Sequence, residues 1–148
     1  MYDIAHRRAA AAFDAVQSRF ARWESLEDAR PFRSVSLSAA VMLRQVGLLQ
    51  LEAFWRTKDR AEPLVLEDLF RWLAGCPMTQ MIFRATRERA AIEVTNPMKG
   101  LLLRTSDEIS MLEAEGLAYL TWHKRFTEGS WQKMERGSQS AGNQVSDA

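Results

Sequence analysis

The chain has 148 residues, which suits one domain with a single continuous core. Hydrophobic residues make up 47% of it and charged residues 26%, as in ordinary globular proteins, and seven Gly with four Pro disfavour a loop-rich all-β fold. Twenty basic and nineteen acidic residues leave a net charge of +1, so any affinity for nucleic acid requires basic residues to gather on one face.

Cysteine content and hydropathy favour a cytoplasmic protein with no membrane segment. Cys76 is the one cysteine and therefore cannot form an internal disulfide. No apolar run approaches the ~20 residues of a transmembrane helix. The N-terminal residues lack the apolar core and cleavage site of a signal peptide. We therefore expect a cytoplasmic location and no membrane partner.

The first predicted helix spans about Asp3 to Glu24, where apolar residues recur at spacings of three and four. On a helix this spacing draws one apolar seam. The seam consists of Ala9, Phe13, Val16, Phe20 and Trp23. Arg8 and Arg19 fall within ~20° of each other around the helix, and Arg22 lies ~60° further round. This basic flank is a candidate nucleic-acid surface, and the alternative is an ordinary solvated helix face.

A turn is expected over residues 25–33, because they contain a charge cluster and Pro31. The next helix should then begin near Ser34 or Ser36 and bury a wide apolar face on more than one side. That face consists of Leu37, Val41, Leu48, Leu51 and Trp55, widened by Val46, Leu49 and Phe54. Gly47 interrupts the pattern and predicts a kink or a close helix contact.

The middle of the chain is predicted to form short helices separated by breaks. Residues 59–63 indicate a polar loop, and residues 64–74 indicate a helix that the following Gly-Cys-Pro run ends. A further helix is expected over about residues 78–94. Residues 98–105 are compatible with either a helical turn or an extended connector.

The clearest helix runs from Ser106 to Phe126. Acidic residues open it and basic residues close it, as the helix dipole favours, and Gly129 is expected to end it. Gly116 lies within the apolar stripe of this helix, where glycine costs about 1 kcal/mol relative to alanine. We therefore expect another helix to cross closely at Gly116.

Beyond Gly129 the sequence is rich in Gly, Ser and Gln and shows no periodicity, so it buries too little apolar surface to offset its ordering entropy. We predict a single helical domain over residues 1–128 and a flexible polar tail over residues 129–148, in which Trp131 is the one residue expected to dock. The predicted fold class is all-α, a compact bundle of five to six helices. The residues expected in its core include Phe13, Phe20, Val41, Leu51, Leu69, Leu112 and Leu120.

No set of catalytic side chains is evident in the sequence. His6 and His123 are too far apart for a helix-borne metal pair, and Cys76 has no ligand at metal-site spacing. His123 is more simply a hydrogen-bonded, half-buried residue. Glu113 and Glu115 lie ~200° apart around their helix and do not face each other. We therefore expect a protein that is not an enzyme, with no metal, no cofactor and no small-molecule substrate.

A basic face on a helical module remains as the candidate site, since lysine and arginine aimed at phosphates need no motif beyond their spacing. The candidate RNA-binding residues are Arg8, Arg19, Arg22, Lys58, Arg60, Lys124 and Arg125.

One run near the end of the chain, EGLAYLTWHKRF over residues 115–126, has a distinctive pattern. A glutamate precedes an apolar helix that ends in tryptophan, an intervening residue, lysine, arginine and phenylalanine. This pattern resembles the C-terminal signature of the small α-helical Cmr subunit of type III-B CRISPR effector complexes. The matching residues are Glu115, Trp122, Lys124, Arg125 and Phe126. His123 stands where that family usually has an apolar residue.

Earlier stretches add to this resemblance in the same order. They are the basic, Ala-rich opening from Arg7 to Ala12, then Gly47, Leu48, Phe54 and Lys58, and then the Trp72-Leu73 pair. The resemblance covers roughly residues 7–58, 64–73 and 108–126, and it does not extend to residues 84–104.

The resemblance implies a non-catalytic subunit that packs in several copies beside other Cmr subunits. It also implies that these copies line the guide RNA and help to hold target RNA. The equivalent small subunit of the related Csm complexes is one alternative. A helical protein–protein adaptor with no nucleic-acid contact is another, and salt-dependent retention on single-stranded RNA separates it from an RNA-binding scaffold.

Overall fold

Seven helices form in the part of the chain that the computed structural model describes, which is residues 3–146 for the backbone and residues 3–142 for the side chains. They are α1 (Ile4–Phe20), α2 (Leu26–Val46), α3 (Leu48–Trp55), α4 (Glu62–Gly75), α5 (Gln80–Phe83), α6 (Met98–Leu101) and α7 (Ser106–Ser146). Apart from one isolated bridge between Glu93 and Asn96, these residues form no β-structure. The predicted all-α fold is therefore confirmed. The helix count exceeds the prediction because α5 and α6 are single turns of four residues each.

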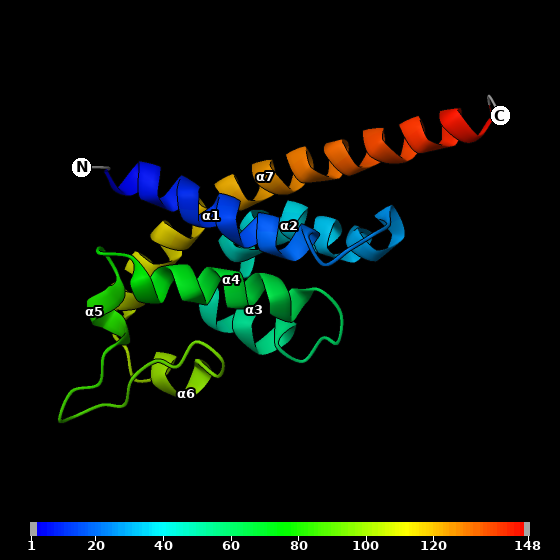
Figure 1. Cartoon of the computed structure of the whole chain (residues 1–148). Helices are drawn as coiled ribbons and strands as arrows, with labels where there is room; N and C mark the ends of the chain where they lie inside the picture. Colours follow the sequence, from blue (N-terminus) through cyan, green and yellow to red (C-terminus); the bar gives the residue numbers. More distant parts are fainter. Residues whose placement is uncertain (1–2, 147–148) are drawn as a thin grey trace.

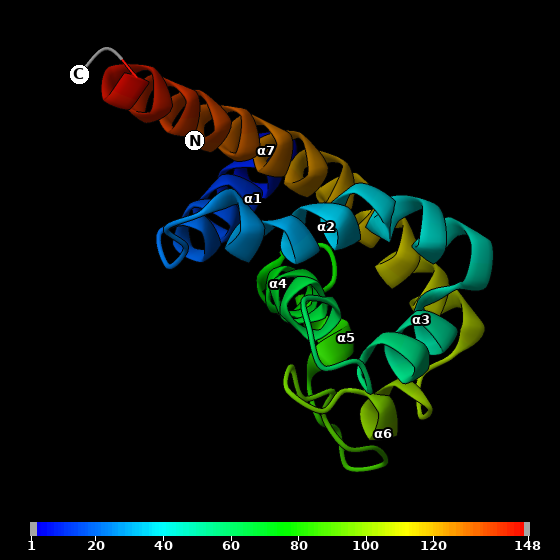
Figure 2. The ribbon, with the colours of Figure 1, turned by 90° about the vertical axis from the view of Figure 1, so that its right-hand side faces the viewer.

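The long helix α7 is the axis of the bundle, and its contacts with α1 and α2 are the most extensive between any two helices. Figures 1 and 2 both show α1 and α2 beside α7, with α4 on their other side and α5 and α6 beyond it, while α3 follows α2 and lies beside α4. α1 and α7 run in the same direction, because their contacts advance together along both helices, from Arg8 with Glu115 to Gln17 with Ser130. In the described residues, no helix combines the length and the apolar character that a membrane span requires.

The core lies where α1, α2, α4 and α7 meet, together with α3. Most of the predicted core residues are buried there, namely Phe20, Leu51, Leu69, Leu112 and Leu120. Phe13 and Val41 are 45% and 47% exposed, so their predicted burial is wrong. On α1, Arg19 is buried against Asp68 of α4. The buried side of the helix is therefore centred on Ala12, Val16 and Arg19, and Phe13 lies at its edge. On α2 the buried row passes through Ala39 and Leu43, each ~200° away from Val41.

α2 begins at Leu26, earlier than the predicted start near Ser34. Ser25 caps the helix, since its hydroxyl accepts a hydrogen bond from the backbone N–H of Asp28 at 3.2 Å. Pro31 removes one backbone hydrogen bond within this helix. The N-cap and the burial of apolar residues on both sides of the proline offset that loss.

Gly47 ends α2 and begins α3, at the point where the sequence predicts a kink or a close helix contact. Its φ is +80°, a conformation that residues with a Cβ rarely adopt. The carboxylate of Glu113 on α7 then accepts a hydrogen bond from the backbone N–H of Leu48 at 2.7 Å. A Cβ on Gly47 would lie 2.9 Å from that same carboxylate, so another residue here would displace the Glu113 side chain from this hydrogen bond.

Residues 84–97 form an extended loop, so the helix predicted over residues 78–94 is wrong except for the turn α5. The buried guanidinium of Arg104 accounts for this loop. It donates hydrogen bonds to the carbonyl oxygens of Ile82 at 2.7 Å, Ala90 at 2.8 Å, Gly100 at 3.1 Å and Arg84 at 3.2 Å. These carbonyls turn toward Arg104, so they cannot all accept the backbone bonds of one continuous helix.

α7 continues to Ser146, so the helix end predicted at Gly129 is wrong. Trp131 docks as predicted, since it is 7% exposed and the guanidinium carbon of Arg33 lies 4.9 Å from its ring centre. This packing offsets the cost of about 1 kcal/mol that a glycine brings to a helix interior. All residues from 135 to 142 are exposed. A flexible tail over residues 129–148 stays a prediction, and residues 147–148 lie outside the described part.

Candidate nucleic-acid interface

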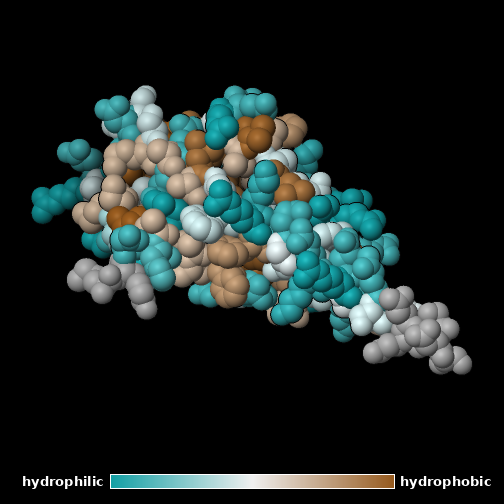
Figure 3. Space-filling model, turned by 90° about the horizontal axis from the view of Figure 1, so that it is seen from above, coloured by the Kyte–Doolittle hydropathy of each residue, from teal (hydrophilic) through white to brown (hydrophobic). Residues whose placement is uncertain are grey.

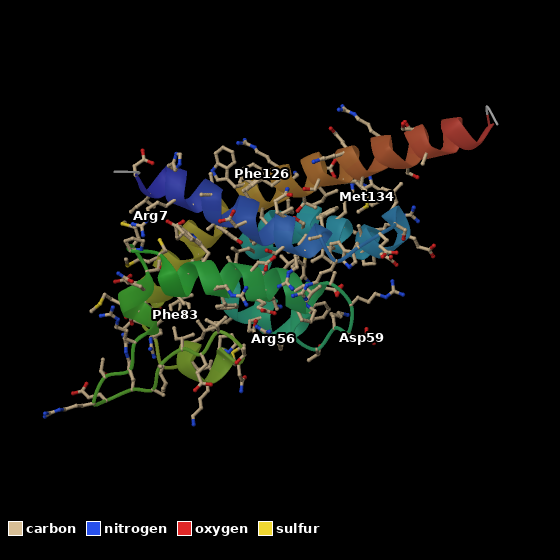
Figure 4. All side chains as sticks on the ribbon, viewed as in Figure 1. Arg7, Arg56, Asp59, Phe83, Phe126 and Met134 are labelled. Carbon is tan, nitrogen blue, oxygen red and sulfur yellow. The ribbon has the colours of Figure 1, made fainter. Side chains whose placement is uncertain are left out.

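The predicted RNA-binding residues do not form one surface. They lie on α1 and just after it, in the connection between α3 and α4, and on α7. Figure 4 shows the separation, because Asp59, between Lys58 and Arg60, lies well apart from Phe126, the residue after Arg125. Two members of the set also take part in ion pairs inside the bundle.

Arg8 pairs with Glu115 of α7. Its Nε and Nη2 donate to the two carboxylate oxygens at 2.5 Å and 2.8 Å, and Trp72 Nε1 of α4 donates to the same carboxylate at 3.1 Å. Burial raises the pKa of Glu115, but the hydrogen bonds from Arg8 and Trp72 outweigh it, so the pKa lies below its ordinary value. The paired charges cancel, and Arg8 is not a free surface cation.

Arg19 is part of a buried polar network that joins four helices. Its Nη2 donates to Oδ1 of Asp68 on α4 at 2.9 Å, and the residue is 9% exposed. The other carboxylate oxygen, Oδ2, lies 3.0 Å from Nε2 of His123 on α7. Nδ1 of His123 lies 2.7 Å from Oγ of Ser36 on α2. Arg19 thus stabilises the bundle from within and is not available to a phosphate.

Ser36, His123 and Asp68 have the composition of a hydrolase triad but lack its accessibility. They are 1%, 0% and 3% exposed, and the Ser36 hydroxyl also lies 3.0 Å from Oγ1 of Thr127. A catalytic serine must reach a substrate carbonyl, whereas here the helices cover it. The geometry therefore supports a structural role. The predicted hydrogen bonding of His123 is confirmed, but the residue is fully buried rather than half-buried.

Arg22 and Arg60 are exposed, and each lies beside carboxylates. Arg22 lines a groove of about 540 Å³ between α1 and α4, together with Glu67. Arg60 lines a groove of about 530 Å³ beside α2, together with Glu62. Both grooves combine charges of both signs, so neither forms a strongly cationic site.

Lys58, Lys124 and Arg125 are exposed and have no carboxylate partner in the described part of the chain. Lys58 Nζ lies 4.6 Å from the ring centre of Phe54, and Arg125 Cζ lies 5.1 Å from the ring centre of Trp122. Lys124 and Arg125 are consecutive, so they point ~100° apart around α7. One flat surface therefore cannot engage both of them equally.

The continuation of α7 adds two basic residues that the sequence analysis missed. Lys133 and Arg136 are exposed, have no carboxylate partner among the described residues, and lie within ~80° of Arg125 around the helix. We call Arg125, Lys133 and Arg136 the α7 basic strip. A signal for it exists in the sequence, because the interval from Arg125 to Arg136 is about three whole helical turns. The helix end predicted at Gly129 concealed that signal.

No group of three or more His, Cys, Asp or Glu side chains is placed to hold a metal ion within the described residues. The polar side chains of the bundle instead bind one another, as the networks around Glu115 and Asp68 illustrate.

Comparison with known families shows that the family described as CRISPR-associated protein (Cas_Cmr5) matches residues 4–130. The match covers α1 to α6 and the part of α7 that begins at Ser106 and reaches Ser130. Comparison with curated proteins gave no match. Comparison with solved structures gave none either.

Proposed function

The chain belongs to the Cas_Cmr5 family of CRISPR-associated proteins, and from this we propose that it is the non-catalytic small subunit of a type III-B CRISPR (Cmr) ribonucleoprotein. Several copies pack beside one another and beside other Cmr subunits along the guide RNA, in the cytoplasm, and help to hold target RNA. The guide reads the target by base pairing, while this subunit supplies positive charge and a complementary shape.

The observation that carries the proposal is the extent of the family match. Residues 4–130 comprise most of the helical bundle, including α1, α2, α4 and the first part of α7, up to Ser130. A match of this extent involves the whole architecture and not one short motif. The matching family is named for Cmr, which favours the Cmr type of small subunit over the Csm type.

Free positive charge on α7 supports contact with RNA. The α7 basic strip has no carboxylate partner in the described chain, so its cations are available to phosphates, whose neutralisation releases counterions. Lys58 and Lys124 also lack a carboxylate partner among the described residues, but Lys58 follows α3 and Lys124 lies ~100° from Arg125 around α7. Arg8 and Arg19 are assigned to the bundle because their partners, Glu115 and Asp68, already balance them.

The non-catalytic role is supported by the burial of the chain's most catalysis-like side chains. Ser36 and His123 lie in the interior, where a substrate has no access to the hydroxyl. In the complex, cleavage of RNA would therefore belong to other subunits.

A helical adaptor that binds only proteins is the competing function. Exposed apolar side chains such as Met81 and Leu102, 65% and 66% exposed, are available to partner proteins in either case. Binding of RNA is thus the property that separates the two functions.

The test compares target-RNA binding by the reconstituted complex with and without this subunit, across a series of salt concentrations. Replacing Arg125, Lys133 and Arg136 of the α7 basic strip together by alanine should flatten the slope of log affinity against log salt by roughly 2, at about 0.7 for each lost contact with a single strand. The loss should be nearly independent of RNA sequence. Arg71→Ala is the matched control, because Arg71 is already paired with Glu67. Wild-type affinity and slope in an intact complex lacking these charges would favour the adaptor.

A further inference from the structure

Aromatic side chains meet on the outside of the bundle where α1 lies against α7. Phe13 and Phe126 contact each other edge to face, with ring centres 5.4 Å apart and ring planes at 79°. Phe126 in turn stacks on Trp122, with ring centres 5.6 Å apart and planes at 20°. Phe13 is 45% exposed, and the other two rings are partly exposed. These rings are accessible from outside, and Figure 4 shows Phe126 on α7 beside α1.

The cations next to these rings come from the same side of α7. Arg125 lies over the Trp122 ring. Lys133 and Arg136 lie on the same side of α7, nearer to its C-terminal end. Trp122, Phe126 and the α7 basic strip all fall within ~100° of the helix circumference. The view from above shows hydrophobic residues interleaved with hydrophilic ones over the body of the molecule and a hydrophilic surface toward the C-terminal end (Figure 3).

The carboxylates on this part of α7 lie on a different side of the helix from the α7 basic strip. Glu128 and Glu135 are ~60° or more from the nearest member of the α7 basic strip. Glu128 is also paired with Arg33 of α2, with Nε and Oε1 2.6 Å apart. The three aromatic rings and the α7 basic strip therefore form an exposed surface with an excess of positive charge.

We propose that Phe13, Trp122, Phe126 and Arg125 form a stacking site for unpaired bases of single-stranded RNA, with Lys133 and Arg136 holding the adjoining phosphates. This inference rests on the proposed function and specifies the site through which it acts. Phe13 offers its exposed ring to a base. Arg125 offers the plane of its guanidinium, held over Trp122, and bases stack on guanidinium planes as they do on aromatic rings.

Charge favours RNA over a protein as the occupant of this surface. Protein–protein interfaces are enriched in aromatic residues and arginine but depleted of lysine, so the rings alone would suit either partner. An excess of cations beside the rings suits single-stranded nucleic acid, which combines stacking faces with a polyanionic backbone. The side of α7 that carries the rings also carries three cations without carboxylate partners in the described chain. Such a site tolerates any base, because every base has a π-face.

The test uses the assembled complex and two single-stranded RNAs of equal length, one normal and one with abasic positions. Phe13→Ala should weaken binding of the normal RNA by about 5- to 160-fold, the effect of losing one stacked base. It should leave binding of the abasic RNA unchanged. Phe13→Tyr should bind as the wild type does, and Phe13→Leu, which keeps apolar volume but lacks a π-face, should behave like Phe13→Ala. Val41→Ala removes another exposed apolar side chain and is the matched control.

Each other outcome overturns the inference in a recognisable way. If Phe13→Leu keeps wild-type affinity while Phe13→Ala loses it, the surface makes an apolar contact and does not stack bases. If Phe13→Ala binds normally with an unchanged salt dependence, the RNA is held by its phosphates alone and the proposed function stands without this site. If removing the whole subunit changes neither RNA affinity nor its salt dependence, the proposed function itself fails.

Discussion

Nε2 of His123 on α7 lies 3.0 Å from Oδ2 of Asp68 on α4, and both side chains are almost completely buried. The second oxygen of Asp68 accepts a hydrogen bond from Arg19 on α1. One carboxylate thus holds three helices together, in an interior where an unpaired charge is costly.

Asp68→Ala should therefore lower the free energy of unfolding by about 3–5 kcal/mol, because it leaves Arg19 buried without its main partner. Chemical denaturation measures the change. Asp14→Ala, which removes an exposed carboxylate from α1, should stay within about 0.5 kcal/mol of the wild type. Equal effects of the two variants would mean that the network contributes nothing to stability.

Gly116 marks the close crossing of α7 with α2 and α4. A Cβ at this position would lie 3.2 Å from Cδ2 of Leu43 and 3.3 Å from Cδ1 of Leu69, which bears out the close contact predicted from the sequence. Gly116→Leu should overpack the crossing and cost about 1–3 kcal/mol. Gly129→Leu is the matched control on the same helix, where a Cβ meets nothing within 4 Å. It should raise the thermal midpoint, since leucine favours helix over glycine by several tenths of a kcal/mol or more. A midpoint that Gly116→Leu leaves unchanged would contradict the crossing.

Arg8 and Arg7 are neighbours in sequence with different expected roles. Arg8→Ala should destabilise the bundle by about 1–3 kcal/mol, because it removes the main partner of the buried Glu115 carboxylate. Arg7→Ala should have little effect, since Arg7 is exposed and has no ion-pair partner in the described residues. Denaturation measures the stabilities, and the salt slope of RNA binding by the complex should be unchanged in Arg8→Ala. A flattened slope with normal stability would return Arg8 to the RNA interface.

Glu108 gives the bundle a pH-dependent contact at the start of α7. Hydrogen bonds from Arg89, then from the backbone N–H of Thr105, lower the pKa of Glu108 from 4.5 to about 2. A carboxyl group whose pKa is lower in the folded state stabilises the fold above its unfolded pKa, and this stabilisation is lost as the pH falls toward the folded value. The contribution should be below about 1 kcal/mol, since the pair is partly exposed.

The stability difference between wild type and Glu108→Gln should accordingly be constant above about pH 5 and should disappear between about pH 4.5 and pH 2. Glutamine keeps an acceptor for the N–H of Thr105, so the comparison isolates the charge. Glu88→Gln at an exposed position is the control. A difference that persists at pH 2 would rule out the ionised pair as its source.

The sequence by itself determined the all-α class, the break at Gly47, the close crossing at Gly116 and most of the leucine core. These features depend on caps, glycines and three–four spacing, which are encoded within one or two helical turns. The family resemblance had the same basis, since its most specific run lies within one helix.

Only the tertiary structure decided which side of α1 is buried, where α7 ends and which basic residues are free. Arg19 is buried because Asp68, 49 residues away, lies within hydrogen-bond distance of it. Residues 84–97 form a loop because Arg104 binds carbonyl oxygens up to 22 residues earlier in the chain. α7 continues past Gly129 because Trp131 docks beneath Arg33 of α2. In each case the deciding partner lies far away in sequence, so a local pattern cannot reveal whether a charged side chain meets a carboxylate, a carbonyl or solvent.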